Sequence, residues 1–143
     1  MITKLSHCCY YVLDQDSAKE FYTSKLGFEV RNDLVMGSDF SEGAQGIRWL
    51  TVSPPGQPEV EIILADTAMG HDAETAAELR SLVAKGALGA GAWETDDCHK
   101  TFRELSERGV VFLQEPADRP YGVEAVFRDD SGNWFSLTER RAG

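Results

Sequence analysis

Three side chains in strand-like segments carry groups that bind metals or move protons: His7, Glu61 and Glu94. Imidazole and carboxylate groups are metal donors, and a histidine also serves as a general base near neutral pH. Side chains alternate between the faces of a strand, so Glu61 shares a face with Ile63, and Glu94 shares a face with Ala90. Two interpretations stay open. The three residues form a displaced metal or acid–base site, or His7 is hydrogen-bonded within the sheet and the glutamates are exposed near strand ends.

Aromatic and basic side chains supply candidates for holding an organic ligand. Trp134 lies two residues before Ser136 and is expected to share its face, so the two residues are candidates for a cleft wall. The alternative for Trp134 is packing in the core, which is the expectation for Trp49 and Trp93. The remaining candidates are two arginines that suit an anionic ligand and two histidines expected at the surface: Arg48, Arg128, His71 and His99.

The composition narrows the range of partners. The 143 residues carry a formal net charge of −10, which argues against non-specific binding to nucleic acid or to an anionic membrane. No apolar run approaches the roughly 18 residues of a membrane span. The start of the chain has no signal-peptide core, and the three cysteines lack the spacing of a disulfide framework. We therefore expect free thiols and a cytoplasmic location.

An internal repeat is the strongest indication of fold. Residues 14–28 have the pattern of a capped amphipathic helix that runs into a strand, and residues 96–110 repeat it. An apolar stretch precedes each helix, a glycine (Gly27 or Gly109) ends it, and three strand-like runs follow. One such sheet with one helix leaves a face exposed. We therefore expect an α+β fold in which two β-α-β-β-β modules form an open, incomplete mixed β-barrel with a cleft.

The expected boundaries follow from the hydrophobic patterns and turn signals. A single domain, 1–143, is predicted, with modules at 1–66 and 88–143 and a helical linker at 67–87. Ser17 and Glu20 have the spacing of a capping box, and Asp14 or Asp16 is the expected helix cap. The expected strands are 5–12, 28–34, 47–53, 59–65, 90–95, 110–114, 123–128 and 134–138. The expected helices are 14–26, 73–85 and 97–108, with long loops at 36–46 and 115–122 and a turn at 129–133.

Three segments resemble the vicinal oxygen chelate superfamily, which includes glyoxalase I, bleomycin-resistance proteins and extradiol dioxygenases. The first is HCCYYVLD at 7–14, followed by Phe21-Tyr22 and by LGF at 26–28. The second is PYG at 120–122, and the third is DDSGN at 129–133, before the last strand. With the repeat they span nearly the whole chain. The resemblance implies the two-module fold and a ligand cleft between the modules.

The resemblance also implies where a metal would bind. Metal-dependent members hold a divalent ion with four side chains from the strands of both modules. Matching the motifs puts His7, Ile63, Ala90 and Ser136 at those positions, and of these only the histidine is a strong donor. We therefore expect no tightly bound metal and no cofactor. A shift of the match by two residues would place Glu61 at the second position instead.

Three functions are compatible with these residues. The favoured one is a small-molecule-binding protein of the bleomycin-resistance type, with an organic ligand touching His7, Trp134 and Ser136 and with Glu61 and Glu94 at the rim. The first alternative is a metal-dependent lyase or dioxygenase that uses His7 with Glu61 or Glu94. The second alternative is a non-catalytic interaction module. The resemblance further implies a homodimer, with the modules paired either within one chain or exchanged between chains.

Overall fold

The computed structural model describes residues 1–36 and 46–141, and within them the chain runs through two modules with the same order of elements. Module 1 consists of β1 (His7–Val12), α1 (Gln15–Glu20) with a π-helical turn η1 (Phe21–Lys25), β2 (Glu29–Met36), β3 (Ile47–Ser53) and β4 (Glu61–Asp66). Helix α2 (Ala73–Ala84) follows. Module 2 consists of β5 (Gly89–Glu94), α3 (Cys98–Glu107), β6 (Val111–Arg119), β7 (Gly122–Arg128) and β8 (Trp134–Arg140).

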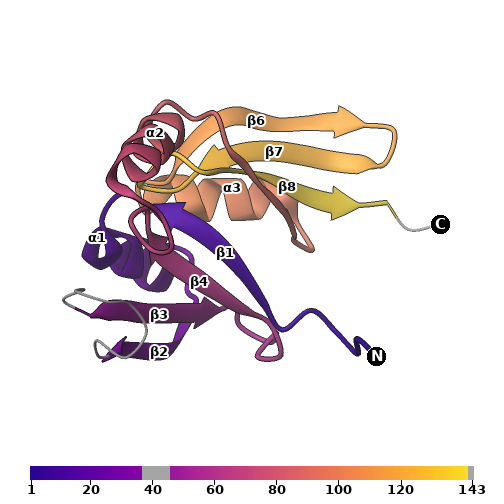
Figure 1. Ribbon diagram of the computed structural model, residues 1–143. Helices are drawn as coiled ribbons and strands as arrows, with labels where there is room; N and C mark the ends of the chain where they lie inside the picture. Colours follow the sequence, from indigo (N-terminus) through magenta and orange to yellow (C-terminus); the bar gives the residue numbers. More distant parts are fainter. Residues whose placement is uncertain (37–45, 142–143) are drawn as a thin grey trace.

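The strands form two four-stranded sheets, in the orders β1-β4-β3-β2 and β5-β8-β7-β6. In each sheet the first strand of the module runs parallel to the last, and the other pairs are antiparallel. Among the described residues no strand of one sheet pairs with a strand of the other, so the barrel stays open (Figure 1). The predicted α+β fold of two β-α-β-β-β modules is confirmed.

A shared hydrophobic core joins the two modules. Helices α1 and α3 pack against the faces of the sheets that are turned toward the middle of the molecule (Figure 1). Alternate strand residues such as Val12 and Ile62 are fully buried there. The rings of Tyr10 and Phe135, one from each module, have their centroids 5.4 Å apart in this single cluster.

Since strand side chains alternate, the other half of the strand residues points to the opposite faces, which α1 and α3 leave uncovered. We call these the outer faces. The register of the strands gives their members. The outer face of module 1 includes His7, Cys9, Tyr11, Leu34, Trp49, Thr51, Glu61 and Ile63. The outer face of module 2 includes Ala92, Glu94, Glu124, Val126, Trp134, Ser136 and Thr138.

A buried polar network around Asp129 fixes how the modules sit together. One carboxyl oxygen of Asp129 accepts the backbone N–H groups of residues 131, 132 and 133 at 2.9, 2.9 and 3.0 Å. The other accepts the Tyr22 hydroxyl of module 1 at 2.7 Å and the Asn133 amide at 3.0 Å. The Asn133 amide also donates to the Tyr11 carbonyl at 2.8 Å. The predicted turn at 129–133 therefore also connects the two modules.

Aspartates cap the first helix of each module. The side chains of Asp14 and Asp97 accept the backbone N–H of Ser17 at 2.8 Å and of Lys100 at 3.0 Å. Because Asp14 is the cap, Ser17 lies inside the helix and the predicted capping box with Glu20 does not form. The Ser17 hydroxyl donates instead to Asp130 at 2.7 Å.

The largest departure from the predicted elements is β6. The sequence predicts a strand that ends at 114 and a loop to 122, but β6 continues to Arg119 through Pro116. Strand β6 is an edge strand, where proline is tolerated, and Pro116 lies in the irregular register between Gln114 and Ala117, where no residue pair is formed with β7. The predicted loop at 36–46 lies mostly outside the described residues.

Candidate functional site

The outer face of module 1 brings His7 and Glu61 together. They are directly paired at the start of β1 and β4, and His7 Nε2 lies 3.4 Å from Glu61 Oε2. The other carboxylate oxygen of Glu61 accepts the Thr51 hydroxyl at 2.7 Å and the Asn32 amide at 3.0 Å. The hydrogen bond from Thr51 contributes most to lowering the pKa of Glu61, with smaller contributions from Asn32 and His7. The carboxylate is therefore ionised and held in one orientation.

Aromatic and apolar side chains surround this polar group. The ring of Trp49 lies 6.1 Å from that of His7, centroid to centroid. Tyr11 lies on the same face, and its ring is 5.4 Å from that of His71. Leu34 is 45% exposed although it is apolar. The face thus combines one anchored carboxylate with uncovered apolar surface, a composition typical of ligand sites.

This register changes the predicted metal positions. Glu61 is the residue beside His7, whereas Ile63 lies beside Cys9 one pair further on that face. The motif match puts Ile63 at the second metal position, and the match shifted by two residues puts Glu61 there, which is the residue beside His7 in this structure. Among the described residues no group of three His, Cys, Asp or Glu side chains is arranged to hold a metal ion. One chain offers the His7–Glu61 pair, which is two donors and fewer than the three that catalytic zinc sites use.

The outer face of module 2 carries its own anchored carboxylate. The Ser136 hydroxyl donates to Glu124 Oε2 at 2.6 Å, and Arg119 Nε lies 3.7 Å from Glu124 Oε1. The hydrogen bond from Ser136 contributes most to lowering the pKa of Glu124. Thr138 Oγ1 lies 3.1 Å from Ser136 Oγ. Trp134 lies on the same face with 37% of its surface exposed.

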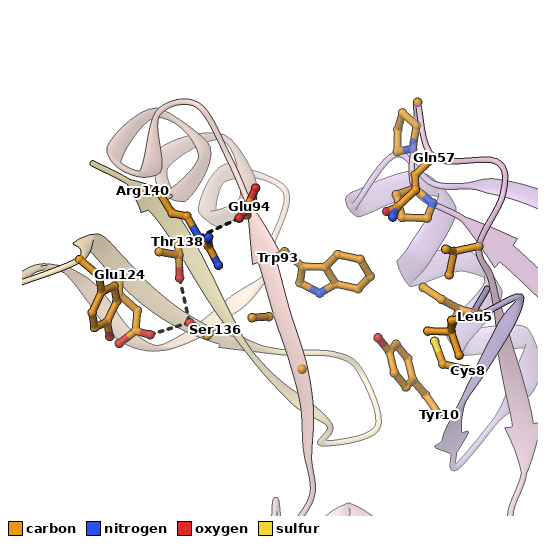
Figure 2. A pocket seen from close by; sticks show the side chains of 18 of the residues that line it. Leu5, Cys8, Tyr10, Gln57, Trp93, Glu94, Glu124, Ser136, Thr138 and Arg140 are labelled. Carbon is orange, nitrogen blue, oxygen red and sulfur yellow. Dashed lines mark hydrogen bonds and ion pairs between the residues drawn. The ribbon is translucent and has the colours of Figure 1, made fainter. Parts of the chain in front are cut away.

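A groove of about 1190 Å³ opens between the two modules (Figure 2). Its lining includes Leu5 and Arg141, which lie near the two ends of the chain. Tyr10 and Trp93 face each other across the groove (Figure 2). Ser136 also lines the groove but lies on the other side of β5 from Tyr10. Glu94 borders the groove and pairs with Arg140 at 2.9 Å. Trp93 packs in the core as predicted, against Phe28 and Phe135, but its buried Nε1 has no hydrogen-bond partner.

The five predicted ligand contacts do not meet at one place in the chain. Glu94 and Ser136 line the groove, but His7, Glu61 and Trp134 do not. A ligand in this groove would therefore not contact His7 or Trp134 of the same chain, so the predicted contacts with His7, Trp134 and Ser136 are not met there. The physical reason is that the modules share a core through their inner faces, so the two outer faces point away from each other.

Three further side chains differ from what the sequence predicts: Arg48, Trp49 and Glu124. Arg48 is bound to Asp33 at 2.9 Å and to Asp16, so it is not free for an anionic ligand. Trp49, predicted to be a core residue, lies on the outer face of module 1. Glu124, for which no sequence pattern predicts a role, lies on the outer face of module 2. Alternation along β3 puts Trp49 on the same face as Thr51, and alternation along β7 puts Glu124 on the same face as Val126. The sequence does not show that these are the outer faces, because that depends on how β3 pairs with β4 and β7 with β8.

None of the helices in the described residues is long and apolar enough to cross a membrane. All three cysteines, Cys8, Cys9 and Cys98, are free thiols, and Cys98 is buried. Burial raises the pKa of all three thiols.

One family model and several known proteins match nearly the whole chain. Residues 4–137 match the model of the glyoxalase/bleomycin resistance protein/dioxygenase superfamily. The chain is 34% identical to protein YurT of Bacillus subtilis, over 91% of this chain and 94% of that protein. The solved structure of UcmS2 is 51% identical, with a TM-score of 0.88 and coverage of 97% and 99%. TnmS3, an antibiotic binding protein from Streptomyces sp. CB03234, is 28% identical, with a TM-score of 0.71 and 98% coverage of both chains.

Proposed function

The chain belongs to the glyoxalase/bleomycin resistance protein/dioxygenase superfamily, and we propose that it binds a small organic molecule of the antibiotic kind without converting it. The observation that carries this proposal is the make-up of the two outer faces. Each presents a tryptophan and a carboxylate whose orientation is fixed by hydrogen bonds: Trp49 with Glu61, and Trp134 with Glu124. Ligand sites combine mostly apolar surface with a few placed polar groups. The similarity to TnmS3 supports an antibiotic as the ligand class.

We propose that a second copy of the chain completes each site. An outer face alone is open to solvent on one side, and apolar side chains on both faces remain exposed, among them Leu34 and Trp134. Since the two outer faces of one chain point apart, they cannot enclose one ligand together. The face of module 1 would therefore cover the face of module 2 from the partner, which gives two equivalent clefts in a symmetric dimer. This is the exchanged form of the predicted homodimer.

We place the protein in the cytoplasm. Cys9 is exposed and Cys8 is half-buried, and neither is in a disulfide. Accessible thiols persist unpaired in a reducing compartment.

A metal-dependent lyase or dioxygenase is the second candidate, because one specific observation favours it. His7 and Glu61 lie 3.4 Å apart and both are suitable donors. In an exchanged dimer the partner's outer face would have to supply at least one further donor. Binding without chemistry is the simpler conclusion from two donors per chain.

Calorimetric titration with a panel of antibiotics that includes bleomycin tests the proposal. We expect at least one compound to bind with a Kd of about 1 μM or tighter and to be recovered with unchanged mass. The variant His7→Ala should weaken binding, whereas His99→Ala, on the exposed surface of α3, is the matched control that should not. Sedimentation should show a dimer. Conversion of the compound, or near-stoichiometric metal that is lost in His7→Ala, would replace the binding function by the enzymatic one.

A further inference from the structure

Each module has one parallel pair of strands, β1 with β4 in module 1 and β5 with β8 in module 2. The first two residues paired across these strands occupy equivalent places in the two modules. In module 1 this pair is His7 on β1 and Glu61 on β4. In module 2 it is Gly89 on β5 and Trp134 on β8. Where one module holds an imidazole beside a carboxylate, the other holds an indole beside a residue with no side chain. The internal repeat is therefore broken at a position that belongs to the proposed ligand site.

The indole of Trp134 occupies the space that a side chain at position 89 would fill. A Cβ atom on Gly89 would lie 2.5 Å from Cζ2 of Trp134 and 2.9 Å from its Cε2 and Cη2. Carbon atoms in contact are about 3.5 to 4.0 Å apart, and the indole is a rigid ring that cannot yield at one atom alone. The backbone at Gly89 does not have a positive φ. The ring, and not the backbone conformation, therefore requires glycine at this position.

We propose that Gly89 is the positioning residue for Trp134, because it leaves room for the indole to lie across β5 as the aromatic wall of the ligand site on module 2. One side of the ring packs on the strand at Gly89. The side chain keeps 37% of its surface exposed, so the other side of the ring is available to a ligand. The role toward a ligand rests on the proposed function, whereas the position of the ring does not.

The direct test follows the indole itself. Spectra of ¹⁵N-labelled protein resolve the indole N–H signals of Trp49, Trp93 and Trp134, and Trp134→Phe assigns the last. In Gly89→Ala we expect the indole N–H signal of Trp134 to shift, while the signals of Trp49 and Trp93 stay in place. In a Trp49→Phe/Trp93→Phe background, where Trp134 is the remaining tryptophan, Gly89→Ala should raise acrylamide quenching of its fluorescence about twofold, because the ring is displaced. An unmoved Trp134 signal in Gly89→Ala would overturn the proposal.

A double variant separates the ring contact from any other effect of alanine. Gly89→Ala should lower the denaturant midpoint in wild-type background but not in Trp134→Ala background, since the clash needs the ring. Binding of Nile red, a neutral planar dye, should weaken about fivefold in Gly89→Ala and in Trp134→Ala, and no further in the double variant. Additive losses would overturn the proposal. If the indole moves as expected but no antibiotic of the panel binds wild-type protein, the proposed function fails while the positioning role stands.

Discussion

Replacement of Asp129 by alanine is the most demanding test of how the modules are held together. Asp129 is 1% exposed, and its carboxyl group accepts five hydrogen bonds, three from the backbone of its own turn and two from side chains. The variant leaves the Tyr22 hydroxyl and the turn N–H groups without this acceptor. Each buried polar group left unpaired costs about 1 to 3 kcal/mol, and water entering the space recovers part of that.

We therefore expect Asp129→Ala to lower the free energy of unfolding by about 4 kcal/mol, in the range seen when one partner of a buried polar network is removed. Tyr22→Phe removes a single hydrogen bond and should cost about 1 to 2 kcal/mol. Burial and the neighbouring carboxyl raise the pKa of Tyr22, so its hydroxyl stays a donor throughout the neutral range.

Urea denaturation at one fixed protein concentration measures these losses, because a dimer makes the midpoint depend on concentration. The matched control is Asp118→Ala, because Asp118 is exposed and its ion pair with Arg141, at 3.5 Å, lies in solvent. This variant should change the free energy of unfolding by less than about 0.5 kcal/mol. An Asp129→Ala loss no larger than that of Asp118→Ala would refute the reasoning. So would a Tyr22→Phe loss equal to that of Asp129→Ala.

Three further predictions concern the outer faces and the core. The pKa of Glu61 is lowered from its ordinary value of 4.5, so its stabilising effect is complete above pH 4.5 and is lost as the pH falls through the lowered value. The stability difference between wild type and Glu61→Gln should therefore be larger at pH 7 than at pH 3, and a difference independent of pH would contradict it. Ser136→Ala removes the main cause of the lowered pKa of Glu124, so a ¹³C titration of the Glu124 carboxyl should show a higher pKa than in wild type, while Glu61 stays unchanged. Trp93→Phe should cost less than about 2 kcal/mol in urea denaturation, because the lost packing is partly offset by removal of the unpaired buried Nε1, and a larger loss would indicate that this N–H has a partner.

The sequence by itself determined the elements and their duplication. Local signals sufficed there: Asp14 and Asp97 cap the first helix of each module, and alternating apolar residues mark the strands. Strand β6 was predicted too short because a proline ends a central strand, and only the pairing shows that β6 is at an edge. The pairing of His7 with Glu61 likewise depends on the register between β1 and β4, which are far apart in the chain.

The tertiary structure alone decided which surfaces of the modules are buried and which stay exposed. The resemblance implies that His7 and Ser136 lie at one ligand site, because both match metal positions of the superfamily. The observed arrangement instead depends on contacts between distant residues, such as Tyr22 with Asp129 and Tyr10 with Phe135. These contacts bury the inner faces of both modules against each other, so the outer faces point apart. A repeat specifies each module through local periodicity, but the way two modules pack is set by side-chain fit across their interface, which periodicity does not encode.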